Sequence, residues 1–440
     1  MSQPSKSKSQ PPKAPGADAT LQQWLSWLES IHPTEIDLGL DRVLVVLRRL
    51  FRKNPAARVI TVAGTNGKGS TVATLETLLQ ASGRRTGAYT SPHLQNYNER
   101  IRIDGKDVDD ATLISAFEKV ESARGFVTLT YFEFGTLAAL VVLAESGVQD
   151  WILEVGLGGR LDAVNVIDAD LAIITSVDID HVAFLGDNRE VIGFEKAGIL
   201  RPGIPAIVAD IDPPSSVLQQ AAAQKVALVR AGQDYTIRET LAGNGEAAAT
   251  LHYQGQAISL PTGPLPVQSV AAAVMAMRTL DPDMSISVLE NALAQVTVPG
   301  RFERLERSPD MYVDVGHNPH AANWLSARLK ALKVGGRKIH AVYAALMDKD
   351  VEGVAQAMAP VVDSWHLAGL DVPRGLGAEA LRAKLATCNL EQVSVHESVA
   401  NAVAAAKAGA ASNDILIVFG SFFTVAEART LFFLSPQTPS

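Results

Sequence analysis

The sequence lacks several features that mark particular classes of protein. Its 440 residues include one cysteine, Cys388, so no disulfide can form within the chain, and this fits a reducing compartment. No apolar run approaches the roughly 20 residues that span a bilayer. Basic residues are outnumbered, and the net charge of -8 is opposite to the basic excess typical of nucleic-acid-binding proteins. The sequence therefore predicts a soluble cytoplasmic protein that binds neither membranes nor nucleic acid.

The N-terminal stretch lacks an apolar core of its own. Residues 1–19 are rich in proline, serine and lysine, which does not fit a secretory signal and predicts a disordered tail. The rest of the chain has an ordinary globular balance, since hydrophobic residues make up 47% and charged residues 20% of the sequence. At this length we expect two or three domains.

Strand-like and helix-like patterns alternate along the chain. Short runs rich in β-branched residues predict buried strands at residues 58–63, 85–90, 150–156, 169–177 and 204–210, with helices between several of them. This alternation is typical of an α/β protein with a mostly parallel sheet. Residues 234–260 change to short polar–apolar alternations and predict a small antiparallel excursion, followed by helices near 267–280 and 285–296.

Pro299 and Gly300 mark a predicted domain boundary. A second series of strands and helices follows them and is long enough for one normal domain. We therefore expect a tail at residues 1–19, a large domain at 20–298 and a smaller α/β domain at 299–440.

A glycine-rich loop connects the predicted strand at 58–63 to a helix. It reads GTNGKGS and departs from the pattern GxxxxGK[ST], because two residues separate Gly64 from Gly67 and Gly69 stands between Lys68 and Ser70. Glycines let backbone N–H groups turn toward an anion, the helix start adds unpaired donors, and the lysine adds a full positive charge. The loop predicts a phosphate site, and the alternative is an ordinary strand-to-helix turn with a chance lysine.

Polar side chains follow other predicted strands. Glu154 ends one strand before a glycine-rich turn and is a candidate magnesium ligand or base, or else a surface carboxylate. Asp178, Asp180 and His181 follow the next strand and either line a site or cap a helix. Because the carboxyl ends of parallel strands share one edge of a sheet, we expect these side chains to converge.

Two further motifs are less specific. Lys196 lies on a helix with an apolar face, and its spacing alone favours a solvated lysine over one that points into a site. The stretch VDVGHNPHA places Asp314 at a strand end and His317 in the following turn, a geometry that suits the edge of a nucleotide site.

Together these motifs resemble those of the bacterial bifunctional dihydrofolate synthase/folylpolyglutamate synthase family, within the Mur ligase superfamily. The stretches that carry the resemblance run in order from Ile36 to Ala428: IDLGLDRV, VAGTNGKGS, TSPHL, NERIRIDG, TYFEFGTLAAL, LEVGLGGRLDAVN, DHVAFLG, EKAGI, PGRFE, DVGHNPHA and FGSFFTVAEA. The resemblance implies a P-loop NTPase-like central domain that binds ATP and a pterin, and a smaller Rossmann-like glutamate ligase domain.

The resemblance also implies a reaction. L-Glutamate would be joined to 7,8-dihydropteroate, giving dihydrofolate, and to reduced folates, through an acyl phosphate made with ATP. Mg²⁺ would be the metal, a monovalent cation is a further option, and the enzyme would be a monomer. Three alternatives stay open: a folylpolyglutamate synthase without dihydropteroate activity, a Mur-type ligase acting on a nucleotide-linked sugar, and a nucleotide-binding switch without ligation.

The family pattern further implies roles for particular residues. The ATP site would comprise Thr65, Asn66, Gly67, Lys68, Gly69, Ser70, Ser269, Arg301 and Asp314. The metal would be bound by Ser91, Glu154 and His181. The pterin would contact Ile36, Asp37, Leu38, Thr130, Tyr131, Phe132, Leu161, Asp162 and Ala163. The catalytic residues would be Lys68, Lys196 and His317, with the Lys196 amine carbamylated to N6-carboxylysine.

One departure from the family pattern concerns the helix before the domain boundary. Related sequences often carry an asparagine at its start, where it meets ATP. Here the segment reads LPVQSVAAAVMAM, and we expect Ser269 or Gln268 to take that place.

Overall fold

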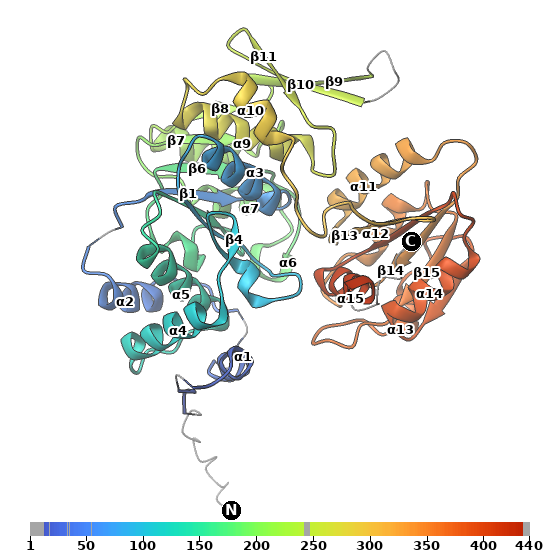
Figure 1. Ribbon diagram of the computed structural model, residues 1–440, viewed down its shortest axis with the longest axis horizontal. Coiled ribbons are helices and arrows are strands. Elements are labelled where there is room, and N and C mark those ends of the chain that lie inside the picture. The colour runs from blue at the N-terminus through green and yellow to red at the C-terminus, as the bar shows by residue number, and fades with distance from the viewer. Residues whose placement is uncertain are drawn as a thin grey trace, which may run out of the picture.

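The computed structural model describes residues 13–16, 18–32, 34, 36–53, 55–241 and 247–433. Of the predicted tail, residues 1–12 and 17 lie outside the described residues, and Ala14 and Ala19 pack against the hydrophobic core. Figure 1 shows two α/β bodies side by side, one formed by the blue to yellow part of the chain and one by the orange to red part. No helix in the described ranges is long and apolar enough to cross a membrane.

The first body is built on an eight-stranded sheet in the order β4-β3-β2-β5-β1-β6-β7-β8. Its strands are β1 (Arg58–Ala63), β2 (Thr86–Tyr89), β3 (Ile101–Ile103), β4 (Lys106–Asp107), β5 (Asp150–Glu154), β6 (Leu171–Ile174), β7 (Pro205–Val208) and β8 (Ala227–Arg230). All neighbours from β2 to β8 are parallel, and only β3 and β4 pair in the antiparallel sense. The prediction of a mostly parallel sheet is confirmed.

Helices cover both faces of this sheet, which explains why its central strands are mostly apolar. On one face, Ile60 and Val62 of β1 share a core with three helices: α3 (Lys68–Ala81), α9 (Val267–Leu280) and α10 (Ile286–Leu293). On the other face, Val59 and Ala63 pack with α1 (Leu21–Ser30), α2 (Asp41–Leu50), α4 (Asp110–Arg124), α5 (Tyr131–Glu145), α7 (Arg189–Ala197) and α8 (Ser215–Ala223). Successive residues of β1 thus point to opposite cores.

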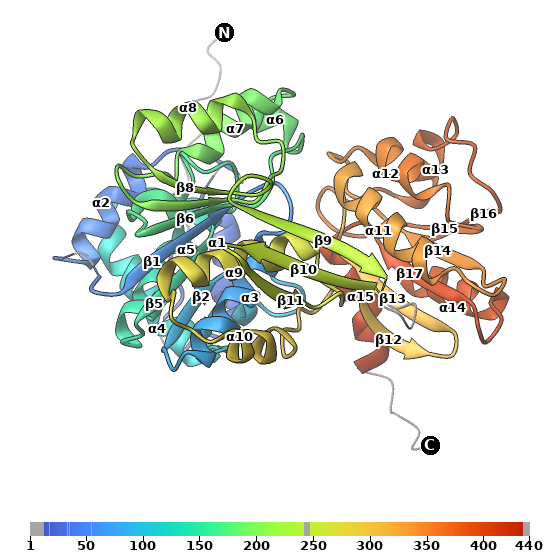
Figure 2. The same cartoon turned by 90° about the horizontal axis from the view of Figure 1, so that it is seen from above.

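A small antiparallel sheet interrupts the α/β pattern, as the sequence predicts. It consists of β9 (Tyr235–Leu241), β10 (Ala247–Tyr253) and β11 (Gln256–Leu260), with β10 in the middle. Figure 2 shows β9 and β10 reaching from the first body toward the second. Tyr235, Thr236, Ile237 and Glu239 of β9 line the large cavity that is described below.

The second body contains a six-stranded sheet in the order β12-β13-β17-β14-β15-β16. Its strands are β12 (Glu303–Arg307), β13 (Asp310–Asp314), β14 (Ile339–Tyr343), β15 (Ser364–Ala368), β16 (Val393–His396) and β17 (Ile415–Phe419). All pairs are parallel except β12–β13. One face packs on α11 (Pro319–Leu332), α12 (Val351–Met358) and α13 (Ala378–Lys384), and the other packs on α14 (Val399–Gly409) and α15 (Phe422–Phe433). This is the second α/β unit that the sequence predicts.

Candidate functional site

A cavity of about 820 Å³ lies where the carboxyl ends of the central strands face the second body. Its lining takes residues from β5, the loop after β1, the start of α9 and the turn after β13. The sequence-predicted residues that line it are Thr65, Asn66, Gly67, Lys68, Gly69, Ser70, Ser91, Glu154, Asp180, His181, Lys196, Gln268, Ser269, Arg301, Asp314 and His317. The structure therefore brings the expected nucleotide, metal and catalytic residues into one cleft.

The glycine-rich loop is held in shape by the strand beside it. The Thr65 amide donates to the Ser176 carbonyl at 2.8 Å, and the Asn66 amide donates to Ser176 Oγ at 3.0 Å. Gly67 precedes α3 with φ of +84°, and a Cβ built on it would lie 2.3 Å from Ser269 Oγ. Only glycine combines this backbone conformation with such a close approach. The loop thus presents the start of α3, with its unpaired N–H groups, to the cleft.

Lys68 folds back over the loop that carries it. Its Nζ donates to the carbonyls of Gly64 at 3.0 Å and Thr65 at 3.2 Å. Burial lowers the pKa of Lys68, although the carboxylates of Glu154 and Asp180 oppose that shift. A partly buried cation at the centre of a loop of backbone donors is the arrangement that attracts a phosphate group.

Ser269 stands where the family pattern often has asparagine. It is 5% exposed and touches the loop at Gly67, and its carbonyl accepts a hydrogen bond from Thr71 Oγ1 at 3.2 Å. Gln268 also lines the cleft, but its side chain is exposed. Of the two candidates, Ser269 therefore contacts the glycine-rich loop.

The candidate metal ligands differ in chemistry. Glu154 is 4% exposed, and its Oε2 accepts from the Ser91 amide at 3.3 Å. Burial raises the pKa of Glu154, while the charges of Lys68 and Arg301 oppose this. Burial lowers the pKa of His181 to about 4, so its imidazole is neutral near pH 7 and free to bind a metal.

The carboxylate of Glu154, the hydroxyl of Ser91 and the imidazole of His181 all line one cleft. Such a set suits a small divalent cation whose remaining ligands are oxygen atoms from water or phosphate. Across the described residues, however, no group of three or more His, Cys, Asp or Glu side chains is arranged to hold a metal by itself. A metal at Ser91, Glu154 and His181 would therefore need further oxygen ligands, which phosphate groups on the neighbouring loop could supply.

Lys196 is buried, so the interpretation that its spacing favours, a solvated lysine, is wrong. It lies in the last turn of α7, is 3% exposed and lines the cleft. Its ammonium makes no ion pair or hydrogen bond with the rest of the described chain. Burial, with a smaller contribution from Lys68, lowers the pKa of Lys196 to about 7. A large fraction of this amine is therefore uncharged and nucleophilic near neutral pH.

The second body contributes an acidic and a basic side chain. Asp314 ends β13 and accepts hydrogen bonds from the amides of Phe302 at 2.8 Å and Gly316 at 2.7 Å. The Arg301 guanidinium lies 5.3 Å from the ring centre of Phe422. Burial raises the pKa of Asp314 and lowers that of Arg301, and their opposite charges counter both shifts.

Contacts between the two bodies pair two candidates from the sequence, Asp180 and Asn66, with three residues that the sequence did not indicate. Asp180 Oδ1 lies 2.6 Å from Lys349 Nζ, and its Oδ2 accepts from Asn318 Nδ2 at 3.1 Å. Asn318 and Asn66 exchange two side-chain hydrogen bonds, and His320 Nδ1 lies 3.1 Å from Asn66 Nδ2. Lys349 follows the end of β14 by six positions. It could therefore have been found by the rule that polar residues after parallel strands lie near the site, which identifies Glu154.

His317 and Asp178 have different positions relative to the cleft. His317 Nδ1 lies 3.0 Å from the Val315 carbonyl, and its Nε2 lies 3.5 Å from Asp180 Oδ2. Burial alone would raise the pKa of Asp180, but the contacts with His317 and Lys349 outweigh it and hold that pKa well below its usual range. Asp178 does not line the cleft. Its backbone N–H and carbonyl bond the Thr65 hydroxyl at 2.9 and 3.0 Å.

The residues expected to contact a pterin lie outside this cleft: Ile36, Asp37, Leu38, Thr130, Tyr131, Phe132, Leu161, Asp162 and Ala163. Arg42 joins two of their groups, because it donates to Asp37 Oδ2 at 2.6 Å and to Glu133 Oε1, in the first turn of α5, at 2.8 Å. The Phe132 ring lies 2.5 Å from a Cβ built on Gly156, a residue that lines the cleft.

Asp162 organises the turn after β5. It is 2% exposed and accepts from the amides of Leu157 at 2.8 Å and Val164 at 2.9 Å. Burial raises its pKa to about 6, and these hydrogen bonds oppose the shift. Because Leu157 lines the cleft, the turn connects the pterin candidates with the metal candidates.

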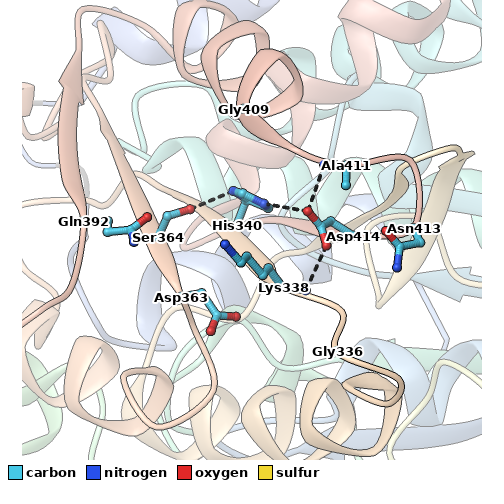
Figure 3. A pocket seen from close by; sticks show the side chains of 10 residues that line it. All are labelled: Gly336, Lys338, His340, Asp363, Ser364, Gln392, Gly409, Ala411, Asn413 and Asp414. Atoms are coloured by element: carbon cyan, nitrogen blue, oxygen red, sulfur yellow. Dashed lines mark hydrogen bonds and ion pairs between the residues drawn. The ribbon is translucent and has the colours of Figure 1, made fainter.

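A second cavity, of about 340 Å³, lies at the amino ends of the strands in the second sheet (Figure 3). Ser364 Oγ lies 2.7 Å from His340 Nδ1, and His340 Nε2 lies 3.3 Å from Asp414 Oδ2. Asp414 also accepts from the amides of Lys338 at 2.9 Å and Ala411 at 2.8 Å. These groups satisfy one another and tie the strand starts together, so the larger cleft is the candidate active site.

Both bodies of the chain are similar to known proteins. The family model of the Mur ligase middle domain matches residues 62–270, and that of the Mur ligase glutamate ligase domain matches residues 300–422. The dihydrofolate synthase/folylpolyglutamate synthase of Escherichia coli is 43% identical over 414 residues, which cover 94% of this chain and 96% of that protein.

Solved structures show the same similarity. The E. coli protein in complex with DHPP and ADP has a TM-score of 0.89 and 42% identity, covering 95% of this chain and 99% of that chain. A bifunctional folylpolyglutamate synthase/dihydrofolate synthase with Mn, AMPPNP and L-glutamate bound has a TM-score of 0.87 and 39% identity, covering 96% and 100% of the two chains.

Proposed function

The chain belongs to the dihydrofolate synthase/folylpolyglutamate synthase family of Mur ligases, and we propose that it joins L-glutamate both to 7,8-dihydropteroate and to tetrahydrofolate polyglutamates. It is an ATP-dependent, amide-forming ligase. The observation that carries the proposal is the single cleft, which faces the phosphate loop and Glu154 toward Arg301 and Asp314 of the second body.

The chemistry explains why such a cleft needs positive charge. A carboxylate is a poor acyl donor, because its leaving group would be an oxide. Transfer of the γ-phosphoryl group of ATP to a carboxylate oxygen gives an acyl phosphate and ADP. The amine of L-glutamate then attacks the acyl carbon, inorganic phosphate leaves, and the amine loses a proton. Cations lower the repulsion between the two carboxylates and the triphosphate most strongly in a site that excludes water.

We assign the charges of this reaction to side chains from both bodies. Lys68 and the backbone donors of its loop would hold the β- and γ-phosphates, and Ser269 would support the loop. Arg301 and Asp314 would contact ATP from the other side of the cleft, with His317 next to the reacting groups. In this assignment residues 20–298 bind ATP and the pterin and residues 299–440 bind glutamate, so the bodies must be docked for the reaction to occur.

Ser91, Glu154 and His181 would hold the metal. A relative binds Mn together with AMPPNP, and we propose Mg²⁺ for this chain. When bound, the ion would neutralise charge on the phosphate oxygens. Lys196 would react as a neutral amine with CO₂ and lose a proton, giving N6-carboxylysine. The side chain would thereby change from a buried cation to an anion that faces the metal site.

The pterin would bind beside the cleft, at the start of α5 and the turn after β5. Contact between Phe132 and Gly156, and between Asp162 and Leu157, links this region to the cleft lining. The acceptor carboxylate would then enter the cleft near Glu154. We further propose that the enzyme is a monomer, as the family resemblance implies, and that it acts in the cytoplasm. Its single cysteine, which is buried, fits a reducing compartment.

One assay tests the proposal. The protein is incubated with ATP, Mg²⁺ and labelled glutamate, and dihydropteroate and tetrahydrofolate are offered in parallel. We expect label in both acceptors. Label in the folate alone would show a monofunctional folylpolyglutamate synthase. If neither acceptor gains glutamate, the proposed function is wrong, and ATP hydrolysis independent of any acceptor would indicate a nucleotide-binding switch.

A further inference from the structure

Three side chains of the second body converge on one carboxylate of the first, that of Asp180. Lys349 Nζ lies 2.6 Å from Oδ1, while Asn318 Nδ2 and His317 Nε2 lie 3.1 and 3.5 Å from Oδ2. The side chains of Lys349 and Asp180 are only 7% and 10% exposed. We call these four residues the Asp180 junction.

The junction is connected to a candidate metal ligand through one oxygen atom. Asp180 Oδ1, which receives Lys349, also accepts a hydrogen bond from the His181 amide at 2.7 Å. His181 has φ of 52° and ψ of 43°, a left-handed conformation that costs a non-glycine residue free energy and persists only where its surroundings impose it. The carboxylate that pairs with Lys349 therefore also holds the backbone of His181.

The junction is connected to the phosphate loop as well. Asn318 donates to Asp180 and exchanges two further hydrogen bonds with Asn66, at 3.0 and 3.1 Å. Asn318 caps the start of α11, since its Oδ1 accepts from the Ala321 amide at 2.9 Å, so this side chain is fixed to the second body. One rigid element of the second body thus contacts both the metal side and the phosphate side of the cleft.

Charge burial makes the junction depend on docking of the two bodies. Among the described residues, the Lys349 ammonium pairs with Asp180 alone. Removing one partner of a buried pair leaves the other as an uncompensated buried charge, whereas separation of the bodies returns both groups to water. The ion pair is therefore strong only in the docked arrangement.

We propose that Lys349 is a positioning residue that couples docking of the second body to assembly of the metal–nucleotide site, by orienting Asp180 and through it His181. Lys349 does not touch the reacting atoms in this role. The inference rests on the proposed ATP-dependent ligation, but it concerns the binding of metal and nucleotide before any acceptor or glutamate is present.

The test is a titration of free Mn²⁺ by electron paramagnetic resonance, with the full-length protein and AMPPNP and without acceptor or glutamate. We expect Lys349→Met and Asp180→Asn each to weaken Mn²⁺·AMPPNP binding by about tenfold or more, and Lys349→Arg to retain most of the affinity. The double variant Asp180→Asn/Lys349→Met should bind Mn²⁺·AMPPNP no more weakly than whichever single variant has the lower affinity. Both substitutions break the same interaction, the ion pair between Lys349 and Asp180.

Lys333→Met is the matched control. Lys333 pairs with Asp363 at 2.8 Å within the second body, away from the cleft, so its loss should leave Mn²⁺·AMPPNP binding unchanged. Circular dichroism on each variant checks that the fold is intact.

Three outcomes would overturn the inference. Additive losses in the double variant would show that Lys349 acts independently of Asp180. Normal Mn²⁺·AMPPNP binding by Lys349→Met, with a raised KM for glutamate alone, would make Lys349 a substrate contact. Poor binding by Lys349→Arg, equal to that of Lys349→Met, would show that a positive charge at this position is not what matters. Because no acceptor is present, these results stay readable even if the ligation assay fails.

Discussion

Replacement of Lys196 by methionine should stabilise the protein and abolish its activity. Burial lowers the pKa of Lys196 to about 7 from an ordinary value of 10.5, so between these values the unfolded chain holds a proton that the folded chain has lost. Stability therefore rises with pH across this window, and the full penalty is present below pH 7. Methionine has a similar volume and no charge, so it removes the penalty with little change in packing.

The size of the effect follows from linkage between protonation and folding. With these two pKa values, the buried amine disfavours folding by about 4 kcal/mol at pH 7 and by about 3 kcal/mol at pH 8.5. Lys196→Met should raise the free energy of unfolding at both pH values. We expect this gain to be smaller at pH 8.5 than at pH 7 by roughly 1 to 2 kcal/mol. Urea denaturation followed by circular dichroism measures it, in metal-free buffer depleted of CO₂ so that the amine is not carbamylated.

A matched control separates burial from a general effect of losing a lysine. Lys330 is exposed on α11, and Lys330→Met should change stability by no more than about 0.5 kcal/mol. Equal urea midpoints for Lys196→Met and the unaltered protein at pH 7 would refute the reasoning, as would a gain that does not depend on pH. Lys196→Ala should also lose ligase activity, and added bicarbonate or short carboxylates should restore part of it if a carbamate is what the site needs.

The other predictions concern the phosphate loop and the metal site. Lys68→Ala should lower turnover by roughly 100-fold or more. It should leave the melting temperature unchanged or raised, because removal of the ammonium from water lowers the pKa of Lys68 in the folded protein; near-native turnover would contradict the assigned role. Gly67→Ala should weaken AMPPNP binding in calorimetry, since φ is +84° and the new Cβ would lie 2.3 Å from Ser269 Oγ; unaltered affinity would show that the loop does not bind phosphate. Glu154→Gln should weaken Mn²⁺·AMPPNP binding by about tenfold, and equal affinity in the spin-resonance titration would remove Glu154 from the metal site.

The sequence predicts the architecture well where strands are buried on both faces. Residues 59–63 are apolar apart from Thr61, residues 415–419 are a continuous apolar run, and both segments form central parallel strands. Polar residues at the carboxyl ends of parallel strands indicate a site, which places Glu154 at an edge of the first sheet and Asp314 at an edge of the second. That these two edges face each other across one cleft is a property of the tertiary structure. The helix α4 carries a readable signal that the sequence analysis does not use, because Leu113, Phe117 and Val120 recur at helical spacing behind the N-cap Asp109.

Short edge strands are harder to predict. The strand β12 reads ERLER, with polar residues on most positions, and it pairs only with β13 at the edge of the second sheet. The strands β3 and β4 are three and two residues long. Such segments lack a core of their own, and their pairing is fixed by the neighbouring strand rather than by their own pattern.

Burial of individual charged side chains is likewise a property of the tertiary structure. The residues next to Lys196 and Lys349 in the sequence do not indicate burial. In the structure, however, Lys196 is buried beside the cleft, and the Lys349 side chain is buried in a contact between the two bodies. Spacing along the chain gives the face of a helix or the end of a strand. It does not show which segment from a distant part of the chain will cover that position.

The reciprocal bonds between Asn66 and Asn318 have a consequence for how the protein ages. Asn66 precedes Gly67, and asparagine followed by glycine is the dipeptide in which the side-chain amide is most easily lost, through attack by the next backbone nitrogen and closure of a succinimide ring. That attack requires the amide to rotate toward its own backbone. In the docked arrangement the amide is instead held by Asn318 and His320. Contact between the two bodies should therefore slow chemical decay of the phosphate loop, and enzyme kept with bound nucleotide should outlast enzyme stored without it.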